Sequence, residues 1–157
     1  LPTPALAADP NWNSDYHHRL GTYWGGLYTT VTDYSRFLQM LLMGGEYKGV
    51  RIFSPATVRV MTEDRIKRMP GLSAADQLTY AKTLGWLLRD NGNWPFMGSL
   101  VSHRAFGHYG VTGCGAWADP KTGLVCAIFT NKSHAHGGVI MYELALIFNA
   151  VAASLLE

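Results

Sequence analysis

The stretch of sequence that decides the fold is residues 104–131, which read RAFGHYGVTGCGAWADPKTGLVCAIFTN. Three extended runs are predicted within it: Arg104 to Tyr109, Gly113 to Ala118, and Leu124 to Thr130. The last two runs are joined by residues 119–123, where proline follows aspartate and a glycine is available for a left-handed conformation, as in a type I turn. We therefore predict an antiparallel meander.

Helices are predicted on both sides of this meander. Downstream, apolar residues recur at three-to-four spacing over residues 139–156, and because Glu143 and Asn149 interrupt them we expect a packed amphipathic helix, not a membrane span. Upstream, Thr32 is the expected N-cap of a helix that ends at Gly44 and Gly45. A second helix is expected from Pro55 to Thr62, with Ser54 as its N-cap.

The rest of the chain shows weaker patterns. Residues 1–31 lack a sustained period and are predicted to be an irregular surface segment, and residues 46–53 read as a short connector. Residues 64–82 read as a surface excursion with at most a short helical turn near Ser73 to Leu78. Residues 84–89 read as one further strand.

These elements predict one domain over residues 1–157, since this length suits a single hydrophobic core. Its expected parts are the irregular segment 1–31, helices over 32–62, and sheet strands with a C-terminal helix over 84–157. The fold class is α/β of the α+β type: an antiparallel sheet flanked by helices on one or both faces.

Composition limits the classes of partner. Charged residues make up 15% of the chain, against about 25% in an average domain, so an unusual share of the surface should be buried, some of it against another polypeptide. The net charge is +2 and no basic cluster stands out, so no nucleic acid or membrane surface is indicated. Cys114 and Cys126 are the only cysteines; free buried thiols are favoured, and a disulfide remains open.

The block from Phe106 to Gly113, the turn at 119–123 and the ending Thr130-Asn131 resemble the third conserved element of the serine β-lactamase-like hydrolases. That family includes class C β-lactamases, penicillin-binding proteins and esterases. Its motif, a strand ending in Lys/His-Thr/Ser-Gly, maps onto His108, Tyr109 and Gly110. Residues 25–30 and 84–86 are also similar to the family, so the chain resembles the C-terminal half of a β-lactamase/transpeptidase-like fold.

The resemblance implies roles for five residues. The backbone N–H of Val111 would donate to the oxyanion together with the N–H of a nucleophilic serine. His108 would act by hydrogen bonding or charge and not as the general base. Tyr109, Gly110 and Thr112 would contact substrate, although Tyr109 replaces the usual small hydroxyl residue, which disfavours β-lactam or D-Ala recognition and favours esterase-like use.

Other motifs in the chain are given no catalytic role. A literal Lys-Thr-Gly occurs at residues 121–123, but the preceding Asp119-Pro120 makes it a hairpin turn. The neighbouring histidines 17 and 18, and 134 and 136, lack carboxylate or cysteine companions at metal-ligand spacing. We therefore expect no metal and no cofactor.

The nucleophile implied by the resemblance is missing. None of the eight serines is followed three residues later by lysine, and no tyrosine is followed two residues later by Asn or Ser. We therefore expect a partner, an N-terminal segment of the same protein carrying Ser-x-x-Lys, without which the chain is inactive. The completed enzyme would hydrolyse a small ester, amide or β-lactam through an acyl-enzyme. The residues leave its compartment open, and the resemblance favours the periplasm or the outside of the cell. The alternative is a non-catalytic binding or structural module.

Overall fold

The structure is a computed structural model that describes residues 14–23, 25–90, 96–110, 113–130 and 139–155. Its elements follow in the order α2 (Asp15–Leu20), α3 (Val31–Leu42), β1 (Glu46–Tyr47), β2 (Val50–Arg51), α4 (Pro55–Thr62), the 3₁₀ turn η1 (Ile66–Arg68), α5 (Ala74–Thr79), β3 (Leu87–Leu88), β4 (Phe106–Tyr109), β5 (Gly115–Asp119), β6 (Leu124–Ile128) and α6 (Val139–Leu155).

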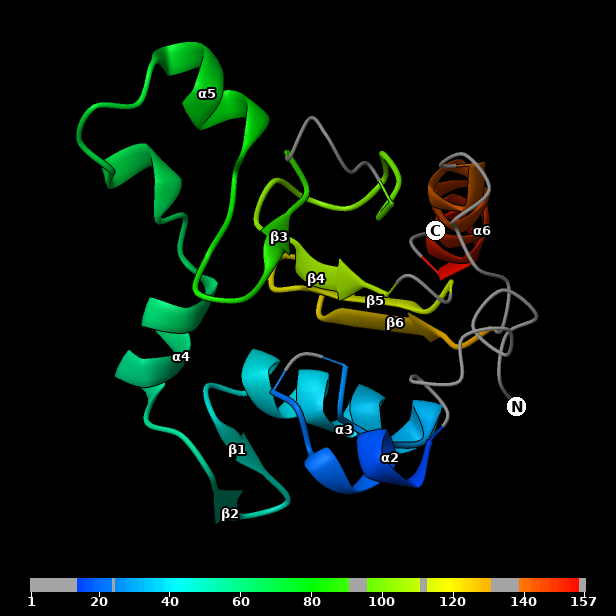
Figure 1. Cartoon of the computed structure of the whole chain (residues 1–157). Helices are drawn as coiled ribbons and strands as arrows, with labels where there is room; N and C mark the ends of the chain where they lie inside the picture. Colours follow the sequence, from blue (N-terminus) through cyan, green and yellow to red (C-terminus); the bar gives the residue numbers. More distant parts are fainter. Residues whose placement is uncertain (1–13, 24, 91–95, 111–112, 131–138, 156–157) are drawn as a thin grey trace.

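The predicted meander is confirmed. Four antiparallel strands form a sheet in the order β3-β4-β5-β6, so each strand pairs with its neighbour in the sequence. In the central pair, Gly107 lies opposite Trp117 and His108 lies opposite Ala116. Together with the helices around it, this sheet confirms the predicted fold class, an antiparallel sheet flanked by helices (Figure 1).

Helices cover both faces of the sheet (Figure 1). On one face, Leu38 and Leu41 of α3 pack in a cluster with Phe106 of β4. On the other face, Leu144 and Phe148 of α6 pack in a second cluster with Trp117 of β5. Successive residues of a strand point to opposite faces, so β4 sends Phe106 to the first cluster and Tyr109 to the second.

The start of α3 corrects the prediction of Thr32 as its N-cap. Thr30 caps the helix instead: its hydroxyl oxygen accepts a hydrogen bond from the backbone N–H of Asp33 at 3.1 Å, and the hydroxyl donates to the Asp33 carboxylate at 2.9 Å. An N-cap side chain accepts a hydrogen bond from the backbone N–H of the second or third helical residue, and Asp33 is the third residue of the helix that Thr30 caps. Thr32 lies inside the first turn.

Three further expectations need correction. Within the segment predicted to be irregular, residues 15–20 form α2, since the hydroxyl of Ser14 caps the N–H of His17 at 3.1 Å. The connector over residues 46–53 contains the β1-β2 hairpin. The strand expected over 84–89 is regular only at β3, because Gly85 has a φ of 113° and bends the chain before it. The short helix expected near residue 73 is confirmed as α5.

At Gly107 the backbone of β4 lies against β5 with no room for a side chain. A Cβ atom there would lie 2.3 Å from the Ala116 carbonyl oxygen and 2.7 Å from the Trp117 Cβ. Because the first contact is with backbone, only a shift of one strand could relieve it. We expect Gly107→Ala to destabilise the protein by about 1–3 kcal/mol, the usual cost of overpacking.

Urea unfolding of Gly107→Ala would measure this cost, and Gly115→Ala on the neighbouring strand is the matched control. A Cβ at residue 115 would meet Leu144 Cδ1 at 3.2 Å, and this flexible side chain can move aside. A smaller loss for Gly107→Ala than for Gly115→Ala would contradict the close strand approach.

Candidate functional site

The strand β4 presents the residues predicted to form the site at its C-terminal end. Hydrogen-bonded neighbours hold it on both sides, β3 opposite Phe106 and Gly107, and β5 along its full length. A strand held on two edges is a rigid support. The structure therefore brings His108, Tyr109 and Gly110 together at one place, while Val111 and Thr112 lie outside the described residues.

His108 is exposed, and one of its two ring nitrogens is occupied by its own strand. Its Nδ1 lies 2.7 Å from the carbonyl oxygen of Tyr109 and 3.0 Å from the Tyr109 backbone nitrogen. Nδ1 therefore donates to that carbonyl when protonated and accepts from that N–H when not. No partner of Nε2 is found among the described residues, so Nε2 is the atom that His108 presents to a ligand.

Tyr109 is half-buried beside the cluster on the α6 side of the sheet. Its ring stacks on His108 with centroids 5.5 Å apart and lies 5.6 Å from the Phe96 ring. Burial raises the pKa of the Tyr109 phenol, so the hydroxyl stays neutral at ordinary pH. The residue thus offers an aromatic wall beside His108, where the family has a small hydroxyl side chain.

Gly110 and Gly113, which follow β4, are held by hydrogen bonds that the sequence did not indicate. The Gly110 N–H donates to the Cys114 carbonyl at 2.7 Å, and the Gly113 N–H donates to the Gly110 carbonyl at 3.0 Å. The Thr130 hydroxyl, just beyond β6, donates to the Gly113 carbonyl at 3.0 Å. Thr130 thereby holds the turn next to the candidate site. Within the part of the chain that the structure describes, Cys114 and Cys126 form no disulfide, and both are half-buried.

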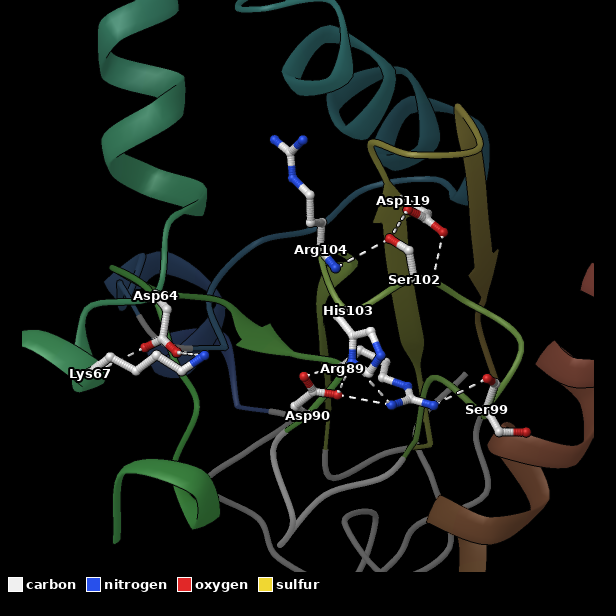
Figure 2. Close-up of polar contacts among 9 residues, drawn as sticks. All are labelled: Asp64, Lys67, Arg89, Asp90, Ser99, Ser102, His103, Arg104 and Asp119. Carbon is white, nitrogen blue, oxygen red and sulfur yellow. Dashed lines mark hydrogen bonds and ion pairs between the residues drawn. The ribbon is translucent and has the colours of Figure 1, made fainter. Parts of the chain in front are cut away.

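The start of β4 is fixed by a buried carboxylate, Asp119, which the sequence indicated only as part of a turn. Asp119 is fully buried and accepts hydrogen bonds from the Ser102 hydroxyl at 2.5 Å and the Ser102 N–H at 2.8 Å (Figure 2). It also accepts one from the Lys121 N–H at 2.9 Å. Burial raises the pKa of Asp119, but these hydrogen bonds outweigh it and hold the pKa below its ordinary value. Asp119 therefore joins the β5-β6 turn to the loop that leads into β4.

The literal Lys-Thr-Gly lies in that β5-β6 turn, as predicted. Gly123 has a φ of 76° and its N–H donates to the Asp119 carbonyl at 2.8 Å. Lys121 is exposed there. The sheet register pairs Phe106 with Ala118 near this turn and His108 with Ala116 farther along, so the turn lies toward the opposite end of β4 from Tyr109.

The structure shows no metal-binding group of the ordinary kind in the part of the chain that it describes, where no three His, Cys, Asp or Glu residues gather. His17 and His18 lie in α2, and His134 and His136 lie outside the described residues.

Comparison with known proteins identifies the class. Residues 2–149 match the model of the family described as Beta-lactamase. Because the match takes in almost the whole chain, the chain belongs to this family of serine hydrolases, as its resemblance predicts.

Particular relatives share less of their length with it. A "Putative D-alanyl-D-alanine carboxypeptidase" of Escherichia coli O157:H7 is 31% identical over 111 residues, which cover 70% of this chain and 23% of the relative. An "N-acetylmuramyl-L-alanine amidase" of Bacillus subtilis (strain 168) is 35% identical over 113 residues, 69% of this chain and 22% of the relative. The chain thus spans less than a quarter of these curated relatives.

Among solved structures, a penicillin-binding protein homolog from Caulobacter crescentus is similar, with 26% sequence identity and a TM-score of 0.48. The similarity covers 73% of this chain and 30% of that one.

Proposed function

We propose that this chain supplies the oxyanion strand of a serine hydrolase that works through an acyl-enzyme. The observation that carries the proposal is β4, which β5 pairs along its full length and β3 pairs at Phe106 and Gly107, and which presents Nε2 of His108 near its C-terminal end. Acyl transfer places negative charge on the substrate oxygen, and fixed donors stabilise that charge without reorganising. The Val111 N–H and the N–H of the nucleophilic serine would be these donors, and His108 would add a further hydrogen bond or a positive charge.

The nucleophile is proposed to lie on another segment of the protein, one that carries Ser-x-x-Lys. In this motif one helical turn places the lysine amine beside the hydroxyl, where it activates the serine for attack on the acyl carbon. The leaving group departs with a proton, and water then cleaves the acyl-serine ester. None of the serines in this sequence has a lysine at the required spacing.

Two surfaces support such a completing segment. The edge of β6 that faces away from β5 pairs with no strand in the described part of the chain, and an open edge can accept another strand. Helix α6 exposes large apolar side chains on its outer side, namely Tyr142, Leu146, Ile147 and Leu155. Large apolar side chains exposed together on one helix mark a surface that another element normally covers. We propose the completing protein segment as that cover. No described helix is long and apolar enough to cross a membrane.

The proposed substrate is a small ester in preference to a D-Ala-D-Ala peptide or a β-lactam. Tyr109 places an aromatic ring where the family uses a small hydroxyl group to contact a substrate carboxylate, and Phe96 packs against that ring at 5.6 Å. The names of the relatives point to amide substrates. A panel of p-nitrophenyl acetate, nitrocefin and a D-Ala-D-Ala peptide would therefore distinguish the three classes.

A fluorophosphonate label tests the proposal directly. We expect the full-length protein to gain one adduct, located by peptide mass spectrometry on the serine of Ser-x-x-Lys, and to lose ester hydrolysis as the adduct forms. The 157-residue chain alone should gain no adduct and turn over no ester. Labelling of one of this chain's own serines, with turnover by the chain alone, would show that the proposed division of the site is wrong.

A further inference from the structure

A hollow of about 510 Å³ lies at the other end of β4 from His108. Helices α3 and α4, the strand β3 and the start of β4 contribute to its wall, and neither His108 nor Tyr109 lines it. Its volume is in the range of small-molecule sites, about 300–1,000 Å³. The hollow is therefore separate from the candidate active site.

The floor of this hollow is apolar. Its buried lining side chains are Leu41, Val58, Ala81, Leu88 and Phe106. They come from five different parts of the chain, and Phe106 belongs to the sheet itself. A ligand that enters must therefore carry an apolar group, because a fully polar molecule would lose hydration against this floor without compensation.

The acidic groups on the rim already have partners in the protein. Asp64 lies 3.7 Å from the Lys67 ammonium, and Glu63 lies 3.9 Å from the Arg65 guanidinium. Asp90 lies 2.9 Å from Arg89 and 2.8 Å from His103 Nδ1 (Figure 2). These carboxylates are therefore poor sites for a cationic ligand.

Two cations on the rim have no such partner. The guanidinium groups of Arg59 and Arg104 make no hydrogen bond or ion pair within the described part of the chain, although both residues line the hollow and are exposed. In Figure 2 the Arg104 side chain extends away from the Ser102–Asp119 contacts, and its dashed line starts from the backbone nitrogen, not the guanidinium. The guanidinium fork suits a carboxylate, which it can bind through two parallel hydrogen bonds.

The charge balance of the rim limits the ligand to one negative charge. Three lining cations, Arg59, Lys67 and Arg104, face the three lining carboxylates named above. Among the described lining residues, only the two unpaired guanidinium groups are available to an anion. One carboxylate therefore suits the hollow better than a doubly charged phosphate, which the lining carboxylates would repel more strongly. We propose that this hollow binds a small monocarboxylate with an aromatic or alkyl group, its carboxylate on Arg59 and Arg104 and its apolar part on the Phe106 floor.

Calorimetric titration of the full-length protein with 3-phenylpropanoate tests this site. We expect saturable one-site binding in the wild type, and at least tenfold weaker binding of 3-phenylpropanamide, which has the same shape without the charge. Arg59→Gln combined with Arg104→Gln should weaken carboxylate binding about tenfold and bring it level with the amide. Lys121→Gln removes an exposed cation outside the hollow and should change neither affinity.

Controls separate this site from the active site, since an ester hydrolase also binds the acid that it releases. The His108→Ala variant should keep the wild-type affinity for 3-phenylpropanoate. Equal binding of carboxylate and amide by the wild type would overturn the proposal even if the double variant failed to fold. Three other results would also overturn it: displacement of the ligand by inorganic phosphate, an unchanged affinity in the double variant, or loss of binding in His108→Ala. Ester turnover is not needed for any of these measurements, so they stand apart from the proposed hydrolase function.

Discussion

Replacement of Asp119 by alanine is expected to destabilise the protein by about 3–5 kcal/mol, because several buried donors lose their acceptor and each donor left unpaired costs about 1–3 kcal/mol. The side chain is fully buried and accepts three hydrogen bonds, two from Ser102 and one from the Lys121 backbone. In the variant, the Ser102 donors lose their acceptor. Because Ser102 leads into β4, we also expect faster amide hydrogen exchange along that strand.

Urea unfolding at several pH values would measure the loss, and Asp33→Ala supplies the control. The Asp33 side chain is 58% exposed, so its removal should cost about 1 kcal/mol or less.

The pKa of Asp119 in the folded protein lies below its ordinary value near 3.8. The stabilisation that the ionised carboxylate gives is therefore complete above the ordinary pKa and disappears as the pH falls through the folded-state pKa. Asp119→Asn keeps the size of the side chain and removes its charge. The free energy of unfolding of the wild type should exceed that of Asp119→Asn at neutral pH, and the difference should disappear below about pH 4. An equal gap at neutral and acid pH would contradict this role.

Replacement of His108 by alanine should lower kcat for ester hydrolysis by the full-length protein by about 10²–10³-fold, the usual effect of losing one donor to a developing oxyanion. Nε2 of His108 is the imidazole atom that the strand leaves available. The side chain is exposed, so the melting temperature should change little. Steady-state kinetics with p-nitrophenyl acetate, beside a thermal melt, would measure both.

Lys121→Ala is the matched control, because a search for the literal Lys-Thr-Gly motif would select that lysine instead. The structure places Lys121 in the β5-β6 turn, and alanine keeps the backbone N–H that binds Asp119. We expect wild-type kinetics. If Lys121→Ala abolished turnover while His108→Ala did not, the assignment of His108 would be wrong.

Local patterns explain why much of the fold was predictable. The meander and α6 follow from alternation and from three-to-four spacing, which depend on residues close together in the chain. The same local reasoning failed at α3, where Thr30 and Thr32 both suit a cap and only the position of Asp33 decides between them. It also missed α2, because six residues capped by Ser14 are too short to show a period.

The sequence alone determined the family, the sheet order and the strand that carries His108, because these depend on motif spacing and turn chemistry. Tertiary structure alone decided that Asp119 binds Ser102, 17 residues away, and that Thr130 holds the turn after Tyr109. It also decided that Arg59 and Arg104 share one hollow. Such contacts join residues that no local sequence pattern links. They exist only after the apolar faces of α3, α6 and the sheet have packed together.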